Sequence, residues 1–173
     1  MSKYSIKTNL NRCISCHACE VHCQAKNRLL PDVRFGKLVT EGPALGKGLP
    51  RLSSFFMPCF HCDPAWCVQS CPTGAMTKRS EDGIVHVQDK LCIGCSSCIN
   101  ACPWGVPAIN TATGKAFKCD FCMDRLDQGL KPACVTGCTA HALEFLETAN
   151  VFFDKKEAKA LGNLRKKHRI PKQ

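Results

Sequence analysis

The chain has 173 residues, sixteen of which are cysteine, and a formal net charge of +10. This length suits one domain or two small intertwined ones, and such a cysteine density usually means a disulfide scaffold in a secreted protein. The first twelve residues, MSKYSIKTNLNR, hold no apolar stretch, no twin-arginine pair and no small-residue cleavage site. We therefore expect a cytoplasmic protein whose cysteines bind metal. Because no apolar run approaches the length of a membrane span, we also expect no membrane anchor of its own.

The basic charge suggests nucleic-acid binding only as long as the cysteines are counted as neutral. An oxidised [4Fe–4S] cluster on four thiolates carries a charge of about −2, so four clusters would contribute about −8. The loaded protein would then have a net charge of about +2. We therefore expect no nucleic-acid partner.

Short strands are predicted wherever apolar and polar residues alternate between turn signals. In chain order they are Tyr4–Thr8, Ala75–Arg79, Ile84–Val87, Ala108–Asn110, Lys115–Lys118 and Ala142–Leu146. The four middle segments read as two hairpins. Short helical turns are predicted before the last cysteine of a motif, as at Val68–Ser70 and Ser97–Ala101.

Two segments stand apart from this pattern. Residues 31–52 are rich in Gly and Pro and fit neither the helical nor the strand period, so we expect a loop or insertion. Residues 149–173 form a basic tail, in which Asp154 and Glu157 make a capping signal for a helix over Lys155–Leu161. The tail is expected to be solvated, or to dock on an acidic partner or a membrane surface.

The cysteines form four groups of four, and none is left over. The groups are Cys13, Cys16, Cys19 and Cys23; Cys59, Cys62, Cys67 and Cys71; Cys92, Cys95, Cys98 and Cys102; and Cys119, Cys122, Cys134 and Cys138. Groups one and three match C-x2-C-x2-C-x3-C at every position. This run is typical of [4Fe–4S] clusters, in which three thiolates come from one tight turn and the fourth from a distant group.

Zinc is the main alternative, because C-x2-C pairs separated by a dozen or more residues are its usual signature. Group four, with eleven residues between Cys122 and Cys134, could be such a site by itself. However, its C-x3-C ending matches groups one and three, and the ligands divide into four complete sets. Tight C-x2-C-x2-C runs are also unsuited to a single zinc ion.

Spacing alone leaves the pairing of the groups open, since groups two and three, or three and four, could form a two-cluster unit. Proline follows the last cysteine of groups two and three, whereas Gln24 and Thr139 follow in groups one and four. This shared chemistry favours pairing two with three and one with four.

Three segments carry a family resemblance: CFHCDPAWCVQSCPTGAM, CIGCSSCINACPWGVP and KCDFCMDRLDQGLKPACVTGCTAHAL. They resemble the four-cluster beta subunits of molybdenum and tungsten oxidoreductases, such as those of dimethyl sulfoxide reductase, formate dehydrogenase and tungsten aldehyde oxidoreductase. The match runs from Cys13 to Leu146 and keeps all sixteen ligands in register. The chain departs from many relatives in lacking their long insertions and C-terminal membrane helix.

The resemblance implies which cysteines share each cluster. The implied sets are Cys13, Cys16, Cys19 and Cys138; Cys119, Cys122, Cys134 and Cys23; Cys59, Cys62, Cys67 and Cys102; and Cys92, Cys95, Cys98 and Cys71. The first two sets would lie in a unit made of residues 1–30 and 111–148, and the other two in a unit of residues 53–110. The implied fold is α+β, with two interlocked ferredoxin-like units of short strands and helical turns around four cubane clusters.

The resemblance also implies the function. The chain would be an electron-transfer subunit in a hetero-oligomer, linking a Mo/W-pterin catalytic subunit to a flavin subunit, a ferredoxin or a membrane acceptor. No nucleophile–base set, phosphate loop or dinucleotide fingerprint is found, so no active site is expected in the chain itself. Two alternatives remain at this point: a free polyferredoxin and a zinc-dependent nucleic-acid-binding protein.

Overall fold

The computed structural model describes residues 2–44 and 48–147, and every structural statement refers to these ranges. Within them the strands are β1 (Tyr4–Thr8), β2 (Lys37–Ala44), β3 (Arg51–Met57), β4 (Met76–Lys78), β5 (Val85–Val87), β6 (Ala108–Asn110), β7 (Lys115–Phe117) and β8 (Leu143–Glu147). The helices are α1 (Ala18–Asn27), α2 (Trp66–Gln69), α3 (Ser97–Ala101), α4 (Met123–Leu126) and α5 (Ala133–Thr136). The chain is thus a small mixed α/β protein with short elements. The helix expected over Lys155–Leu161 lies outside the described residues.

The strands pair as antiparallel two-stranded ribbons: β1 with β8, β2 with β3, β4 with β5, and β6 with β7. The two middle hairpins expected from the sequence are confirmed. Strand β4 is two residues shorter than predicted, β5 and β7 are one residue shorter, and β6 has the predicted bounds. Such small ribbons have little stability alone, so the fold depends on the helices and core side chains that pack against them.

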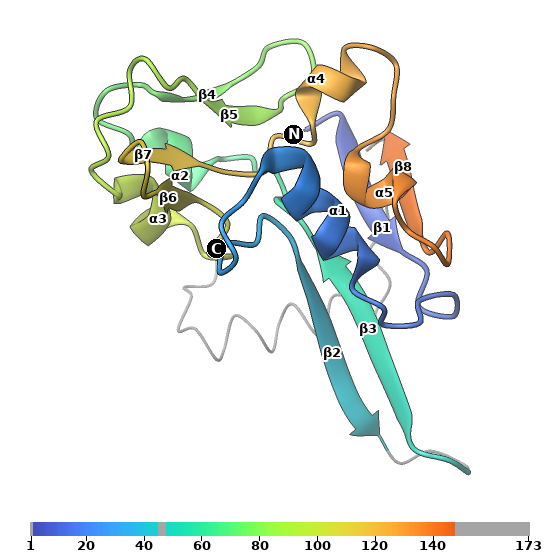
Figure 1. Cartoon of the computed structure of the whole chain (residues 1–173). Coiled ribbons are helices and arrows are strands. Elements are labelled where there is room, and N and C mark those ends of the chain that lie inside the picture. The colour runs from blue at the N-terminus through green and yellow to red at the C-terminus, as the bar shows by residue number, and fades with distance from the viewer. Residues whose placement is uncertain (1, 45–47, 148–173) are drawn as a thin grey trace.

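The β1–β8 ribbon joins the two ends of the described chain. Its register runs from Tyr4 opposite Glu147 to Thr8 opposite Leu143, and the rings of Tyr4 and Phe145 stack with centroids 4.9 Å apart. Helices α1 and α5, which come from the same two ends, pack against each other beside this ribbon (Figure 1). Cysteine groups one and four therefore lie together in space.

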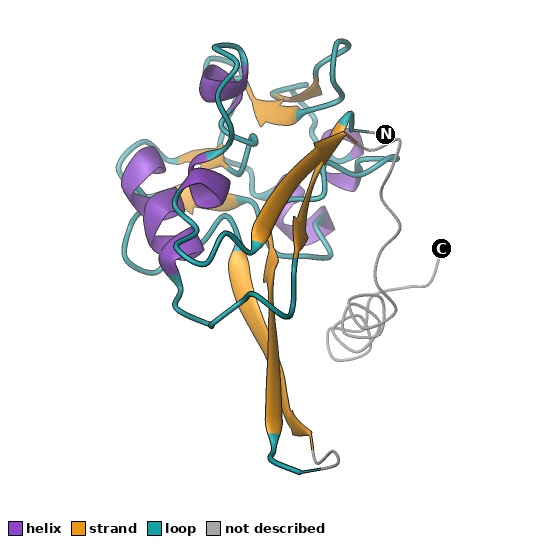
Figure 2. Ribbon diagram, turned by 90° about the vertical axis from the view of Figure 1, so that its right-hand side faces the viewer, coloured by secondary structure: helices purple, strands orange, loops and turns teal. Residues whose placement is uncertain are grey.

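Residues 37–44 and 51–57 pair as a long antiparallel β-hairpin, so the loop predicted for residues 31–52 is wrong over much of its described length. Strands β2 and β3 pair from Lys37 opposite Met57 to Ala44 opposite Arg51, with a register shift between Glu41 and Ala44. The Gly42–Pro43 dipeptide, which belongs to the Gly- and Pro-rich stretch, falls at this irregularity, where a strand tolerates both residues. The hairpin extends away from the rest of the molecule (Figures 1 and 2).

The hydrophobic core is built around cysteine side chains. One buried cluster contains Cys19, Phe56, Cys134, Val135, Cys138, Ala142 and Leu143, and a second contains Ala65, Met76, Val85, Cys98 and Ala116. The second cluster lies where α2 packs on α3 beside β4–β5 and β6–β7. A chain of this size with cores this small needs additional bonds to fold stably.

Candidate metal centre

All sixteen cysteines lie in the described part of the chain, and each is a free thiol. The fold of the described residues contains no disulfide bond. The cysteines are instead distributed along short helices and turns, where most of them are buried or half-buried and Cys16 and Cys95 are exposed.

Groups one and three have the same local backbone conformation, a tight turn around the second cysteine of each group. In group one, Ser15 and His17 flank the second cysteine with φ of 58° and 59°; in group three, Gly94 and Ser96 do so with φ of 71° and 62°. Left-handed residues on both sides of one ligand bend the chain tightly. Helices α1 and α3 then begin at the third ligand's N-terminal neighbour. This repeated turn is what the C-x2-C-x2-C spacing predicts.

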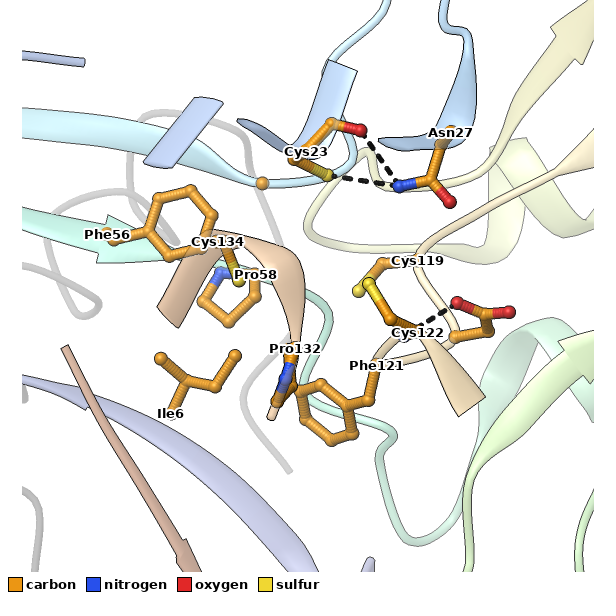
Figure 3. A pocket seen from close by; sticks show the side chains of 12 residues that line it. Ile6, Cys23, Asn27, Phe56, Pro58, Cys119, Phe121, Cys122, Pro132 and Cys134 are labelled. Carbon is orange, nitrogen blue, oxygen red and sulfur yellow. Dashed lines mark hydrogen bonds between the residues drawn. The ribbon is translucent and has the colours of Figure 1, made fainter. Parts of the chain in front are cut away.

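One pocket is lined by four cysteines from opposite ends of the chain (Figure 3). These are Cys23 on α1 and Cys119, Cys122 and Cys134 from group four. Apolar residues, including Phe56 and Phe121, complete its wall. The Asn27 side-chain amide donates to the Cys23 carbonyl at 2.9 Å and lies 3.6 Å from its Sγ. The pocket therefore has four cysteines in its wall and an N–H donor directed at the sulfur of one of them.

A second pocket is lined by another complete set, Cys71, Cys92, Cys95 and Cys98. The backbone N–H of Met76 donates to Cys71 Sγ at 3.4 Å, and that of Ala116 donates to Cys92 Sγ at 3.3 Å. These donors come from β4 and β7, so the two hairpins position N–H groups at the ligand sulfurs.

The eight remaining cysteines form two further groupings. Cys19 and Cys138 are buried together with Cys13 packed against them, and Thr139 Oγ1 lies 3.5 Å from Cys16 Sγ. In the other grouping, burial raises the pKa of Cys62, and the neighbouring Cys59 and Cys102 raise it further. Burial also raises the pKa of Cys67, to about 11, and the neighbouring Cys59, Cys102 and Cys62 contribute to the increase.

These four groupings coincide with the ligand sets that the family resemblance implies. Which cysteine binds which cluster is still a prediction and is taken up under Proposed function. No group of three or more His, Cys, Asp or Glu side chains in the described chain is gathered tightly enough to hold a single metal ion. A cubane offers a separate iron to each thiolate, so its ligands need not converge on one point.

Burial makes several of these thiols hard to ionise without metal. It raises the pKa of Cys19 to about 12 and that of Cys23 to about 11, and it also raises the pKa values of Cys119 and Cys134. Bound iron would supply the positive charge that a buried thiolate requires, and the thiol protons would be released. The donor set, four thiols around an apolar pocket with N–H groups directed at sulfur, fits an iron–sulfur cluster.

A buried lysine lies between two of the groupings, and the sequence analysis did not single it out. Burial alone would lower the pKa of Lys118, but the charges of Cys59, Cys119 and Cys67 outweigh it, and the pKa is raised. The only sequence signal was its place directly before Cys119 in KCDFC.

His61 and Trp104 serve packing and hydrogen bonding. The Val85 N–H donates to His61 Nδ1 at 2.8 Å, and the His61 ring lies 4.1 Å from that of Phe121. Burial, followed by the nearby charge of Lys118, holds the pKa of His61 well below its usual range, so the ring is neutral. Trp104 packs against the Phe60 ring and hydrogen-bonds Cys62, which lowers the pKa of that thiol.

Comparison with known proteins identifies the family. Residues 52–148 match the family described as "4Fe-4S dicluster domain". The chain belongs to this family. Its cofactors are [4Fe–4S] clusters, four for the sixteen cysteines, and the zinc interpretation is wrong.

Three relatives are similar over most of the chain. One subunit of tetrathionate reductase from Salmonella typhimurium is 40% identical over 142 residues, or 81% of this chain and 56% of the relative. One chain of anaerobic dimethyl sulfoxide reductase from Escherichia coli is 36% identical over 151 residues, 83% of this chain and 73% of the relative. Thiosulfate reductase electron transfer subunit PhsB of Salmonella typhi is 40% identical over 146 residues, 83% of this chain and 76% of the relative. The chain thus spans little more than half of the tetrathionate reductase subunit.

The names of these relatives describe parts of reductases, and that of PhsB describes an electron transfer subunit. The predicted family and its electron-transfer role are thereby confirmed. Among the helices of the described residues, none has the length and apolar character needed to cross a membrane.

Proposed function

We propose that this chain relays single electrons through four [4Fe–4S] clusters to or from a Mo/W-pterin catalytic subunit. The observation that carries the proposal is the pair of pockets lined by complete sets of four cysteines, one of them built from the two ends of the chain. When bound, each cluster accepts or gives up one electron. The chain's own residues hold the sulfurs, exclude water and donate N–H groups to the ligands.

The four ligand sets would follow the groupings described above, with two interlocked units. Residues 1–30 and 111–148 would hold two clusters, and residues 53–110 the other two. The β1–β8 ribbon and the α1–α5 contact support the first unit, and the α2–α3 contact supports the second. Each unit would exchange the last cysteine of its two motifs, which is the arrangement of two-cluster ferredoxins.

The sets would form a series along which an electron moves. Cys19 is near enough to Cys134 for its charge to raise the pKa of that thiol, so the first two sets adjoin. Cys59 acts on Cys119 in the same way, which links the second set to the third. Cys67 and Cys98 pack in one core cluster, which links the third to the fourth.

The partner would be bound by surfaces that hold no ligands. The hairpin of residues 37–57 and the basic tail of residues 149–173 contain none of the sixteen cysteines. The outer part of the hairpin is exposed, including Leu49 and Leu52 at 87% and 63% of their surface. We propose a cytoplasmic hetero-oligomer in which one or both segments dock on the catalytic subunit, with a flavin subunit or a ferredoxin as the other redox partner.

The test is anaerobic purification from the native cell. We expect a brown protein with about 16 iron and 16 sulfide per chain, together with a large subunit that contains molybdenum or tungsten. A native preparation with full iron but no second subunit and no molybdenum or tungsten would favour the free polyferredoxin instead.

The docking surfaces are tested by two deletions. Residues 41–53 are replaced by Asn-Gly, which closes the hairpin at the Thr40–Ser54 pair, and residues 154–173 are removed in a second variant. Both variants should keep their iron, because neither loses a ligand. Loss of co-purification in either identifies the docking segment, and full co-purification in a variant that lacks both would remove these segments from the proposal.

A further inference from the structure

Lys118 is a charged side chain in the interior, at the point where β7 ends and group four begins. Its exposed fraction is 6%. The ammonium group donates to the carbonyl oxygens of Val85 and Cys119, at 2.5 Å in each case. It also hydrogen-bonds to Cys59. An ammonium has three N–H donors, and all three are thus directed at fixed acceptors from β5, group four and group two.

Within residues 2–44 and 48–147, no carboxylate forms an ion pair with this ammonium group. The ion pairs found there involve other lysines, such as Lys26 with Asp124 and Lys78 with Asp63. A buried cation is costly unless it is paired. The acceptors from Val85 and Cys119 are neutral carbonyls, so the negative charge that pairs with Lys118 has to come from elsewhere.

The cysteines around Lys118 belong to two different ligand sets. Cys59 and Cys67 belong to the set that includes Cys62 and Cys102, whereas Cys119 belongs to the pocket with Cys23. The ammonium therefore lies between the two middle sites of the proposed series.

We propose that Lys118 is a fixed, shared counter-charge for the two middle clusters and raises the reduction potential of both. This inference builds on the ligand sets of the proposed function. Reduction of a cluster adds one electron and one negative charge, and no bond or proton need change. A positive charge held beside that site makes the added electron more stable. Because the site is buried, mobile ions screen it weakly.

When the charge of Lys118 is removed, the equilibrium constant for reduction of each middle cluster is expected to fall at least tenfold. Tenfold corresponds to about 59 mV for a one-electron couple. The two outer clusters should shift much less, because Lys118 has no contact with their ligands in the described structure.

The experiment compares Lys118→Met with wild type in the purified native complex, using redox titration followed by electron paramagnetic resonance. The expected result is that two of the four midpoint potentials fall by about 59 mV or more, and that the shift persists at high salt. Lys115→Met is the matched control, since this lysine is three residues away on β7 and its Nζ bonds the Asp89 carbonyl at the surface. Its removal should leave all four potentials nearly unchanged.

A second variant, Lys118→Arg, separates charge from shape. If Lys118→Met does not assemble, Lys118→Arg must still assemble full iron with potentials close to wild type. An arginine variant that fails as badly as Lys118→Met would show that shape is required and overturn the proposal. Unchanged potentials in an assembled Lys118→Met protein would also overturn it. Either result leaves the relay intact, whereas wild-type protein without four reducible clusters would overturn the proposed function itself.

Discussion

Cys19 and Cys23 lie one turn apart on α1, yet they are assigned to different clusters, and this makes a sharp test of the ligand sets. Cys23 lines the pocket with Cys119, Cys122 and Cys134. Cys19 is buried in a core cluster that contains both Cys138 and Cys134, and the family resemblance assigns it to the set of Cys138. Each is replaced by Ala, singly and in combination with Cys119→Ala, and iron is measured per chain after anaerobic purification.

The sets fix the expected magnitudes. Each cluster holds four iron atoms, so each single variant should fall from about 16 iron to about 12. In the double variant of Cys23 and Cys119 both losses fall on the same cluster, and the content should stay at about 12. In the double variant of Cys19 and Cys119 two clusters are lost, and about 8 should remain.

Electron paramagnetic resonance provides the second readout, because Cys23→Ala and Cys119→Ala should remove the same signal and Cys19→Ala a different one. Because ligation drives folding, one loss could unfold the whole first unit. In that case all these variants fall to about 8 iron, and the two clusters of the unit of residues 53–110 keep their signals. The assignment would be refuted if the iron losses added in the double variant of Cys23 and Cys119 but did not add in the double variant of Cys19 and Cys119.

Three further predictions concern the frame around the clusters. Gly94→Ala should lower the iron content, because residue 94 has a φ of 71° and an added Cβ would collide with a backbone carbonyl of the β6–β7 turn; iron analysis checks this, and a fully loaded variant would contradict it. Thr8→Val should cost about 1–3 kcal/mol in the free energy of unfolding, since Thr8 Oγ1 accepts the buried Phe56 N–H at 3.0 Å; anaerobic denaturation measures it, with Thr8→Ser as the control that keeps the hydroxyl. Arg79 holds the pKa of Asp127 below its usual range, so this ion pair stabilises the fold above the ordinary aspartate pKa and is lost as pH falls through the lowered value; Asp127→Asn should weaken the dependence of the melting temperature on pH in that acid range, and an unaltered dependence would contradict this.

The cysteine spacing was enough to predict the type of site, because the ligand pattern of a cubane is local and strict. The β4–β5 and β6–β7 hairpins were also predictable, since each lies between two clear turn signals. The β2–β3 hairpin was missed for a physical reason. The outer part of β2 is exposed to solvent, so no alternation of buried apolar residues marks it as a strand. In addition, Gly42–Pro43 in a sequence indicates a break in the strand, whereas here it lies at a register shift within the hairpin.

Lys118 and its contacts could not be predicted for a different reason. Lysine is usually exposed, and one that precedes a cysteine reads as ordinary surface charge. Its burial follows from the meeting of β5 with groups two and four, which are far apart in the sequence. Similarly, the ring contact between His61 and Phe121 depends on how the two halves pack, and no local pattern encodes it.

The pairing of β1 with β8 has a consequence for how the protein is made. Thr8 leaves the ribosome early, but its partner Leu143 is synthesised more than a hundred residues later. The elements of residues 53–110, in contrast, can pair with one another well before that. During synthesis the first part of the chain must therefore wait, with Cys13 to Cys23 unsatisfied and open to oxidation. The cell's iron–sulfur assembly machinery would meet the middle of this polypeptide first and close its two ends last.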